Sequence, residues 1–497
     1  MIDLYFLQTK WILKYAYNAD YSIKYEARLV ACGYSQIYGI DYKDTYAPTT
    51  STLLVNLLFH LGAMFKLEFA LFDVTAAFLE GKNDVVQYAR LPFNCDGTTA
   101  AKGQGMRVRV VGNFYGEKQG PKIWNEQLDK ILITIGFIRC NAHNCLYKWI
   151  NDDGFIILTI HVDDGLMISS NGNLYTEFKT KFSTMVKKMT LTLEFKKFLG
   201  MDVLLIEGNK VALSHLFYIT SRFSEFVKSE RSPMSSTINL RDAEPNNNNE
   251  SLLPDTGAFR FIADRARPDI LVVAGELATG GAESPSDEHI KTSKRTKNYL
   301  NSTKDYSLHL GGLGKLEVFA YSDASYITTG NCKSRLGGCI FLGYDCGAAY
   351  SFSKNSTIVS TISHSSTESE ILALDELVRE LQHLIDILQF ITGEIKLPIK
   401  IYVDNASAIQ LLEKLEGNNK FKHINVRINY LREMIMTGSI ELHFVPTNFN
   451  VADILTKALP PDQFEFLRNI LMHGHNGKEP NFESDNLHFA LTALSIE

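Results

Sequence analysis

The sequence predicts at least two domains that mix helices and strands, the second of them an α/β layer structure. A chain of 497 residues is too long to fold around a single hydrophobic core. In the second half, three consecutive segments have the apolar pattern of strands, at residues 316–321, 337–342 and 348–352. Alternating helix and strand patterns follow them, and this order is typical of an α/β layer architecture.

The remaining elements of the second half follow from the same periodicity. A long helix is expected at residues 366–390, because apolar side chains such as Ile371, Leu374 and Leu381 recur on one face. The later segments are read as a strand at 399–403, helices at 406–414 and 426–436, a strand at 440–445 and a short helix at 451–459.

The first half begins with mixed short strands and is less regular. A strand is expected at 68–74, a helix at 121–135 and a β-hairpin at 155–169. The apolar arms of the hairpin flank Asp163-Asp164-Gly165, and Asp-Gly is a strong signal for a tight turn. Between the halves, residues 229–257 are rich in Pro, Ser and Asn without apolar periodicity, which predicts a linker.

Composition describes an ordinary globular protein, with 45% hydrophobic and 21% charged residues. No stretch approaches the roughly 20 uncharged apolar residues of a membrane span, so an intracellular protein without a membrane partner is expected. The net charge of −6 does not by itself indicate a nucleic-acid partner. A protein that gathers carboxylates around metal ions can nevertheless be acidic overall, so bulk charge is a poor test here.

Three acidic residues of the first half fall where strands end. Asp163 and Asp164 lie at the tip of the expected hairpin, and Asp73 lies near the end of the strand at 68–74. Adjacent carboxylates held up by apolar strands are costly unless a cation neutralises them. Three carboxylates at the ends of neighbouring strands could hold two Mg²⁺ ions about 3.5–4 Å apart, as in polymerases and nucleases.

A second set of acids occurs in the second half. Asp323 and Asp404 end strands, Glu370 stands in the first turn of the long helix, and Asp453 starts the last short helix. Each is unremarkable alone, because acids are common in such positions. Together they supply four carboxylates that an α/β layer would bring to one edge. Glu368 competes for the helix position, but Glu370 leads directly into the apolar face.

Five segments in the first half resemble copia-type retrotransposon reverse transcriptases in their residues, order and spacing. The order of acids in the second half, over residues 316–460, resembles the RNase H domain of the same polyprotein family. The resemblance implies a right-hand α+β polymerase of fingers, palm and thumb, N-terminally truncated, followed by an α/β RNase H-like domain. The five segments are YEARLVACGYSQIYGIDYKDTYAP (25–48), FDVTAAFLEG (72–81), FYGEKQGPKIWNEQL (114–128), HVDDGLMIS (161–169) and FLGMDV (198–203).

The resemblance also implies the roles of the acids. In the palm, Asp73 and Asp163 would bridge two metal ions and Asp164 would support them. In the RNase H domain, the four carboxylates would be catalytic metal ligands, and each site would hold two Mg²⁺ or Mn²⁺ ions. The implied partners are an RNA or DNA template-primer, deoxynucleoside triphosphates and an RNA–DNA hybrid. The ligands of the RNase H domain are Asp323, Glu370, Asp404 and Asp453.

Three further residues match the nucleotide-binding positions of the family. Phe78 matches the steric-gate aromatic that lies under the sugar and excludes a 2′-OH. Arg28 matches the fingers residue that meets the triphosphate, and Gln119 the residue beside the nucleotide pocket. Each residue also has a purely structural interpretation: Phe78 as a core residue, Arg28 as a salt-bridged surface residue and Gln119 as a turn residue. The order of the motifs favours the functional interpretations.

The implied domain boundaries divide the chain into five parts. They are a reverse transcriptase at 1–228, a linker at 229–257, a connection segment at 258–315, the RNase H domain at 316–460 and a C-terminal appendage at 461–497.

The sequence departs from the family in several places. Glu26 and Cys32 replace lysines, His161 replaces a tyrosine, and apolar residues are missing between Ala263 and Asp264. An acid near a triphosphate site would repel phosphate, so weak or absent DNA synthesis is expected. The alternative reading is a degenerate transposon remnant that binds nucleic acid or retains only RNase H activity.

Overall fold

The computed structural model describes residues 6–17, 23–75, 77–92, 106–238, 240, 251–280, 284–325, 334–355, 365–414, 424–480 and 482. The chain divides into two compact units. The first unit contains residues 1–50 and 68–194, and the second contains residues 51–67 and 195–497. Part of the expected linker, residues 241–250, lies outside the described residues.

The first unit contains two sheets, of which the smaller is built on an N-terminal hairpin. Its strand order is β2-β1-β4-β5. Strand β1 pairs antiparallel with β2, and its start pairs parallel with β4. The strands are β1 (Leu7–Tyr17), β2 (Ile23–Ala31), β4 (Lys82–Arg90) and β5 (Arg107–Gly112).

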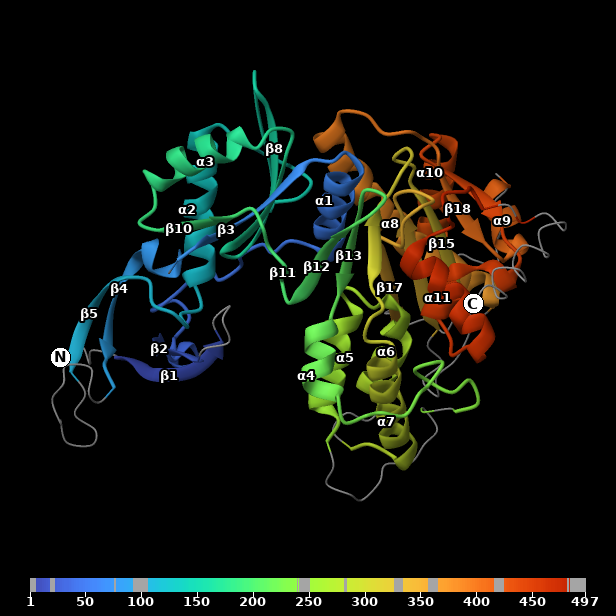
Figure 1. The fold of residues 1–497 in the computed structure, drawn as a ribbon, viewed down its shortest axis with the longest axis horizontal. Coiled ribbons are helices and arrows are strands. Elements are labelled where there is room, and N and C mark those ends of the chain that lie inside the picture. The colour runs from blue at the N-terminus through green and yellow to red at the C-terminus, as the bar shows by residue number, and fades with distance from the viewer. Residues whose placement is uncertain are drawn as a thin grey trace. The chain divides into compact units, whose positions relative to one another are not determined.

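The larger sheet of the first unit has six strands in the order β10-β3-β9-β8-β7-β6. Helices α2 (Gly120–Ile135) and α3 (Asn173–Ser183) lie beside it (Figure 1). Their apolar faces, including Trp124 and Phe178, share one hydrophobic core with the sheet. The strands are β3 (Glu68–Val74), β6 (Ile138–Arg139), β7 (Leu146–Asn151), β8 (Gly154–His161), β9 (Asp164–Ser169) and β10 (Met189–Thr192).

The hairpin between β8 and β9 turns earlier than the sequence predicted. His161 pairs with Asp164, so Val162 and Asp163 form the turn and Gly165 lies inside β9. The reason lies in the neighbouring strand. A Cβ atom on Gly165 would approach the Phe72 ring to 1.9 Å, so this glycine admits a close strand contact rather than a turn conformation.

In the second unit, a four-stranded sheet has the order β11-β12-β13-β14. Helix α1 (Thr52–Met64) contacts β13 and β14. This helix was not predicted, because it is buried almost all round and its sequence therefore has no amphipathic period. The strands are β11 (Lys197–Phe198), β12 (Met201–Ile206), β13 (Lys210–Ser214) and β14 (Leu308–Gly311).

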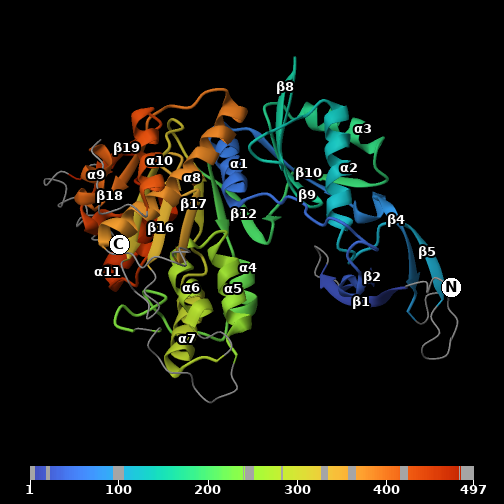
Figure 2. The ribbon, with the colours of Figure 1, turned by 180° about the vertical axis from the view of Figure 1, so that it is seen from behind.

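A group of helices lies at the lower end of the second unit in the views of Figures 1 and 2. A buried ion pair lies among them: Arg267 Nη2 is 2.8 Å from Asp269 Oδ2, and neither side chain is exposed. The Tyr299 hydroxyl donates to the same carboxylate. The helices are α4 (Leu216–Phe223), α5 (Leu253–Ala263), α6 (Leu271–Gly280) and α7 (Asp287–Ser302).

The five-stranded sheet of the second unit has the order β17-β16-β15-β18-β19. Strands β15, β16 and β17 are antiparallel, and β18 and β19 run parallel to β15. This arrangement confirms the predicted α/β layers. The strands are β15 (Phe319–Ser325), β16 (Arg335–Phe341), β17 (Tyr350–Asn355), β18 (Ile399–Val403) and β19 (Ile440–Phe444).

Helix α8 (Ser366–Thr392) packs on β15 and β16, and α10 (Asn425–Met436) packs on α8. Helix α9 (Ala406–Glu413) follows β18. Two predictions need correction here. Strand β15 begins and ends later than expected, so Asp323 lies inside it, and the last short helix is a 3₁₀ helix at Val451–Leu455.

The segment after residue 460 begins with a structural helix, α11 (Pro461–His473). Its Phe464, Leu467 and Leu471 side chains are part of the main core of the second unit. The expectation of an appendage was therefore wrong for residues 461–473, whose apolar positions the preceding Pro460-Pro461 pair had obscured. The other predicted domain boundaries stay predictions. Of the helices the structure describes, none combines the length and apolar character that crossing a membrane requires.

The buried Arg267–Asp269 pair supplies a stability prediction. Asp269→Asn leaves the guanidinium buried without its anion, so we expect the free energy of unfolding to fall by about 3–5 kcal/mol. Urea denaturation followed by circular dichroism measures this. Lys291→Ala removes the exposed Lys291–Glu288 pair and serves as the control, with almost no change expected. An equal effect of both substitutions would contradict the role given to the buried pair.

Candidate active sites

The three acids of the first unit gather where β3, β8 and β9 meet. Asp164 is the direct partner of Asp73 in the β3–β9 ladder, so both side chains lie on one face of the sheet. Asp163 occupies the adjoining turn. Burial, and then the charge of Asp163, raises the pKa of Asp73. Burial, Asp163 and Asp73 together raise the pKa of Asp164 to about 6. The three carboxylates therefore act on one another electrostatically.

The turn that carries Asp163 has a strained backbone. Val162 has φ of 64°, in the left-handed region that β-branched residues avoid. Such a conformation costs about 1–3 kcal/mol and persists only where the surroundings enforce it. The buried Trp124 indole does so, because its Nε1 donates to the Val162 carbonyl at 2.9 Å. Helix α2 thereby fixes the position of the acidic turn.

Two of the three predicted nucleotide-binding residues meet around Tyr115, a residue that the sequence did not single out. The Phe78 and Tyr115 rings pack edge to face with centroids 5.8 Å apart. The Arg28 guanidinium lies 5.7 Å from the centroid of the same tyrosine ring. Gln119 is engaged elsewhere: it is buried and accepts a hydrogen bond from Gln36 Nε2 at 2.9 Å.

Tyr115 also lies within electrostatic reach of the acidic turn. Burial raises the pKa of its hydroxyl, Arg28 opposes the rise, and Asp163 and Asp73 add to it. The phenol is therefore neutral at physiological pH. An aromatic residue in a loop carries no periodic signal, so only the folded structure identifies it as a neighbour of Phe78 and Arg28.

A cavity of about 340 Å³ opens beside Tyr115 and is lined by three cationic side chains. Lys10 and Lys14 come from β1 and Arg28 from β2. Alternate residues of a strand share a face, and Ile12, between the two lysines, pairs with Arg28 across the hairpin. The hairpin therefore presents a cationic surface. The two lysines had escaped notice, because a lysine every few residues is ordinary on an exposed strand.

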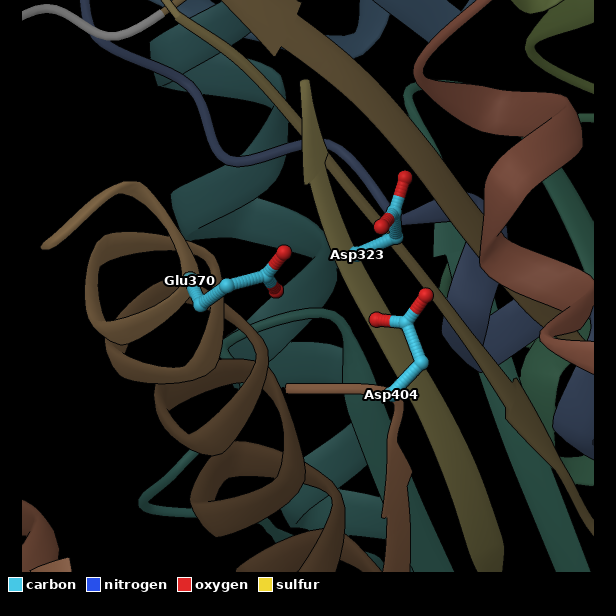
Figure 3. A group of neighbouring side chains, drawn as sticks. All are labelled: Asp323, Glu370 and Asp404. Carbon is cyan, nitrogen blue, oxygen red and sulfur yellow. The ribbon is translucent and has the colours of Figure 1, made fainter. Parts of the chain in front are cut away.

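In the second unit, Asp323, Glu370 and Asp404 converge (Figure 3). Each offers a carboxylate oxygen, and these oxygens all lie within 4.8 Å of one another. Within the described part of the chain, no other three His, Cys, Asp or Glu side chains meet this criterion. Asp323 comes from β15, Glu370 from the first turns of α8 and Asp404 from the end of β18. Glu368 is not in the group.

Asp453 joins the cluster together with two residues that the sequence had not indicated. Lys457 Nζ lies 2.9 Å from Asp453 Oδ1 and 4.0 Å from Asp323 Oδ2. The Thr456 hydroxyl donates a hydrogen bond to Asp323. The 3₁₀ helix at Val451–Leu455 and the residues after it thus provide one acid, one cation and one hydroxyl donor.

Mutual repulsion and burial dominate the protonation of this cluster. Burial raises the pKa of Glu370 well above its ordinary value, and Asp323 and Asp404 raise it further. Burial and Asp323 raise the pKa of Asp453 to about 8, although Lys457 opposes the rise. Burial would lower the pKa of Lys457, but Asp323 and Asp453 raise it on balance. One ammonium among four carboxylates leaves the cluster short of positive charge.

Comparison with known families identifies the first part of the chain. Residues 3–238 match the family model described as reverse transcriptase (RNA-dependent DNA polymerase). This part of the chain is a reverse transcriptase domain. Together with the α/β topology of the five-stranded sheet, the match confirms the predicted fold class, a reverse transcriptase fold followed by an RNase H-like domain.

Sequence similarity to known relatives extends over most of the chain. The chain is 27% identical over 485 residues to the retrovirus-related Pol polyprotein from transposon TNT 1-94 of Nicotiana tabacum, and the match covers 94% of this chain and 36% of the relative. It is 26% identical to that from transposon RE2 of Arabidopsis thaliana, covering 93% and 32%. These relatives bear out the predicted resemblance to transposon Pol polyproteins, and the chain spans about a third of their length.

Solved structures with detectable similarity include two kinds of enzyme. A foamy viral protease-reverse transcriptase in complex with dsDNA has a TM-score of 0.42 and 11% identity, covering 88% of this chain and 77% of that one. LC11-RNase H1 in complex with an RNA/DNA hybrid has a TM-score of 0.21 and 15% identity, covering 28% and 94%.

The raised pKa of Asp453 predicts how stability depends on pH. Between its unfolded pKa near 4 and about 8, the folded chain holds this proton more tightly than the unfolded chain. Stability therefore falls as pH rises through that window. In EDTA, we expect Asp453→Asn to reduce the drop in melting temperature between pH 6 and pH 9 by about 3 °C or more.

Glu207→Gln is the matched control, because Glu207 is an exposed acid in the second unit. It should leave the pH dependence of melting unchanged. The same pH dependence in wild type and Asp453→Asn would contradict the raised pKa.

Proposed function

We propose that this chain is an RNA-directed DNA polymerase and a ribonuclease H with two separate sites that use divalent metal ions. The observation that carries the proposal is the convergence of Asp323, Glu370 and Asp404 within 4.8 Å, in a chain whose other half is a reverse transcriptase domain. Its substrates would be a primed template with deoxynucleoside triphosphates, and the RNA strand of an RNA–DNA hybrid.

The residues of the second site fit a hard divalent cation. Carboxylate oxygens are the ligands that Mg²⁺ and Mn²⁺ prefer. Glu370 Oε2 is buried and lacks a hydrogen-bond partner within the described residues. This oxygen is therefore available as a ligand for a cation. Bound ions would lower the pKa of the attacking hydroxyl or water and stabilise charge on the leaving oxygen.

In the polymerase site, Asp73 and Asp164, paired in the β3–β9 ladder, and Asp163, in the adjoining turn, would hold the ions. The cationic cavity lined by Lys10, Lys14 and Arg28 supports a triphosphate-binding role, because point charges and a guanidinium are the groups that bind phosphate. Positive charge from the two lysines would favour phosphate at this cavity, which argues against the weak synthesis expected from the sequence.

Beside that cavity, Phe78 would exclude a 2′-OH by its size. Gln119 stays a predicted neighbour of the nucleotide. Its bond to Gln36 would make it a support for the pocket wall rather than a direct contact.

In the nuclease site, Thr456 and Lys457 orient and partly neutralise the acids before substrate arrives. The hydroxyl of Thr456 fixes one Asp323 oxygen, which leaves the other free to act as a ligand. Lys457 offsets part of the repulsion between Asp323 and Asp453. The substrate would be an RNA strand paired with DNA, recognised through its 2′-OH groups and the shape of the hybrid.

Reciprocal loss of the two activities tests the proposal. With Mg²⁺ or Mn²⁺, we expect Asp73→Asn to reduce primer extension by about 100-fold or more and to leave cleavage of a labelled RNA–DNA hybrid within about twofold. Asp404→Asn should do the reverse. Extension and cleavage are measured separately on the same full-length preparations.

The helix of the nuclease site offers a matched pair of variants. Glu370→Gln should abolish cleavage, whereas Glu368→Gln, two residues away on α8, should retain most of it. Melting curves establish that both variants are folded. A folded wild-type chain that binds hybrid but neither extends nor cleaves would instead support a degenerate remnant.

A further inference from the structure

Tyr115 lies in the loop between β5 and α2, and its backbone is held against the end of β2. The Ala31 amide donates to the Tyr115 carbonyl at 2.6 Å. The next residue, Gly116, has φ of +87°, and a Cβ atom there would lie 2.3 Å from the Ala31 carbonyl oxygen. Only glycine permits this close seating. The loop therefore holds the tyrosine at a fixed distance from the hairpin that carries Arg28.

The Tyr115 ring is the shared neighbour of Phe78 and Arg28, two of the residues proposed to bind the nucleotide. Its contact with Phe78 is edge to face, at 5.8 Å between centroids and 87° between planes. Its contact with the Arg28 guanidinium is a cation–π approach at 5.7 Å. Both geometries are favourable for an aromatic ring and are lost with an aliphatic side chain.

Phe78 packs against the hydrophobic core of the first unit with only part of its surface. It stands in a one-turn 3₁₀ helix, Ala77–Glu80, and is only partly buried. Gly120 lies beside it and offers no side chain, since even an added Cβ would be 3.9 Å from the Phe78 ring. The tyrosine is thus a defined aromatic neighbour that can fix the tilt of the Phe78 ring.

We propose that Tyr115 determines sugar specificity in the polymerase site by holding the Phe78 ring in its excluding position while seating Arg28 at the triphosphate end. The inference rests on the proposed polymerase function. Tyr115 acts here as a positioning residue, because its effect on the sugar passes through Phe78. A gate that excludes a 2′-OH by size works only if its ring cannot tilt away, and the aromatic edge contact opposes that tilt.

Steady-state primer extension with deoxynucleotides and ribonucleotides tests the proposal in the full chain. We expect Tyr115→Leu to lower the ratio of kcat/KM for deoxynucleotide over ribonucleotide by about tenfold, with KM for the deoxynucleotide raised more than kcat is lowered. Tyr115→Phe keeps the ring, so we expect its ratio of kcat/KM for deoxynucleotide over ribonucleotide to lie within about twofold of the wild-type ratio. The double variant Phe78→Ala with Tyr115→Leu should discriminate no less than Phe78→Ala alone, because both act on one gate.

The outcomes separate failure of the positioning role from failure of the polymerase function. If wild type extends primers and Tyr115→Leu keeps full discrimination, the positioning role is wrong and the polymerase function stands. If wild type extends no better than Asp73→Asn, the polymerase function fails and the positioning role fails with it. Melting and hybrid cleavage report folding, and Tyr115→Met, which fills more of the volume, replaces Tyr115→Leu if the latter is unfolded. A loss in Tyr115→Phe equal to that in Tyr115→Leu would assign the effect to the hydroxyl and overturn the ring-based mechanism.

Discussion

In each unit, the structure must hold neighbouring, partly buried carboxylates together against their mutual repulsion. A carboxylate removed from water and placed beside another loses free energy in its charged form, which is why burial and charge raise the pKa values of Asp164 and Glu370. Packed strands hold the acids in place despite this cost. In each unit, at least one acid stands on a strand inside a hydrophobic core, so the acids cannot separate without disrupting that core.

Cationic side chains of the protein offset only part of this repulsion, and they are placed differently at the two sites. In the second unit, Lys457 lies among the acids, bonded to Asp453 and near Asp323. In the first unit, Lys10, Lys14 and Arg28 line a cavity on the hairpin beside Tyr115. The first arrangement partly neutralises the acids directly, whereas under the proposed function the second would provide charge for a phosphate group of the substrate. This difference is what the proposed function requires of a nuclease that attacks with water and a polymerase that binds a triphosphate.

Much of the fold was predictable where apolar runs have clear ends. Strands β3 and β18 occupy the predicted residues, and α8 extends only two residues past its predicted end. Helix α1 was missed because it is apolar all round, and the β8–β9 turn was misplaced because Gly165 serves the Phe72 contact. The acids could be singled out because they occur in a fixed order, on or beside apolar strands and at the starts of helices. Tyr115 could not be found that way, because its partners Phe78 and Arg28 are distant in sequence, and Lys457 was missed because an i,i+4 pair with Asp453 is ordinary on a helical segment.

The central claim is that both sets of acids are arranged to hold divalent cations. Anomalous diffraction from crystals of the chain grown with Mn²⁺ tests it most directly, because it locates the ion without requiring turnover. The account predicts at least one anomalous peak among Asp323, Glu370 and Asp404, and this peak should disappear in Glu370→Gln. It predicts a second peak beside Asp73 and Asp163. Well-ordered carboxylates without any anomalous peak, and with Lys457 still the cation nearest to Asp323, would contradict it.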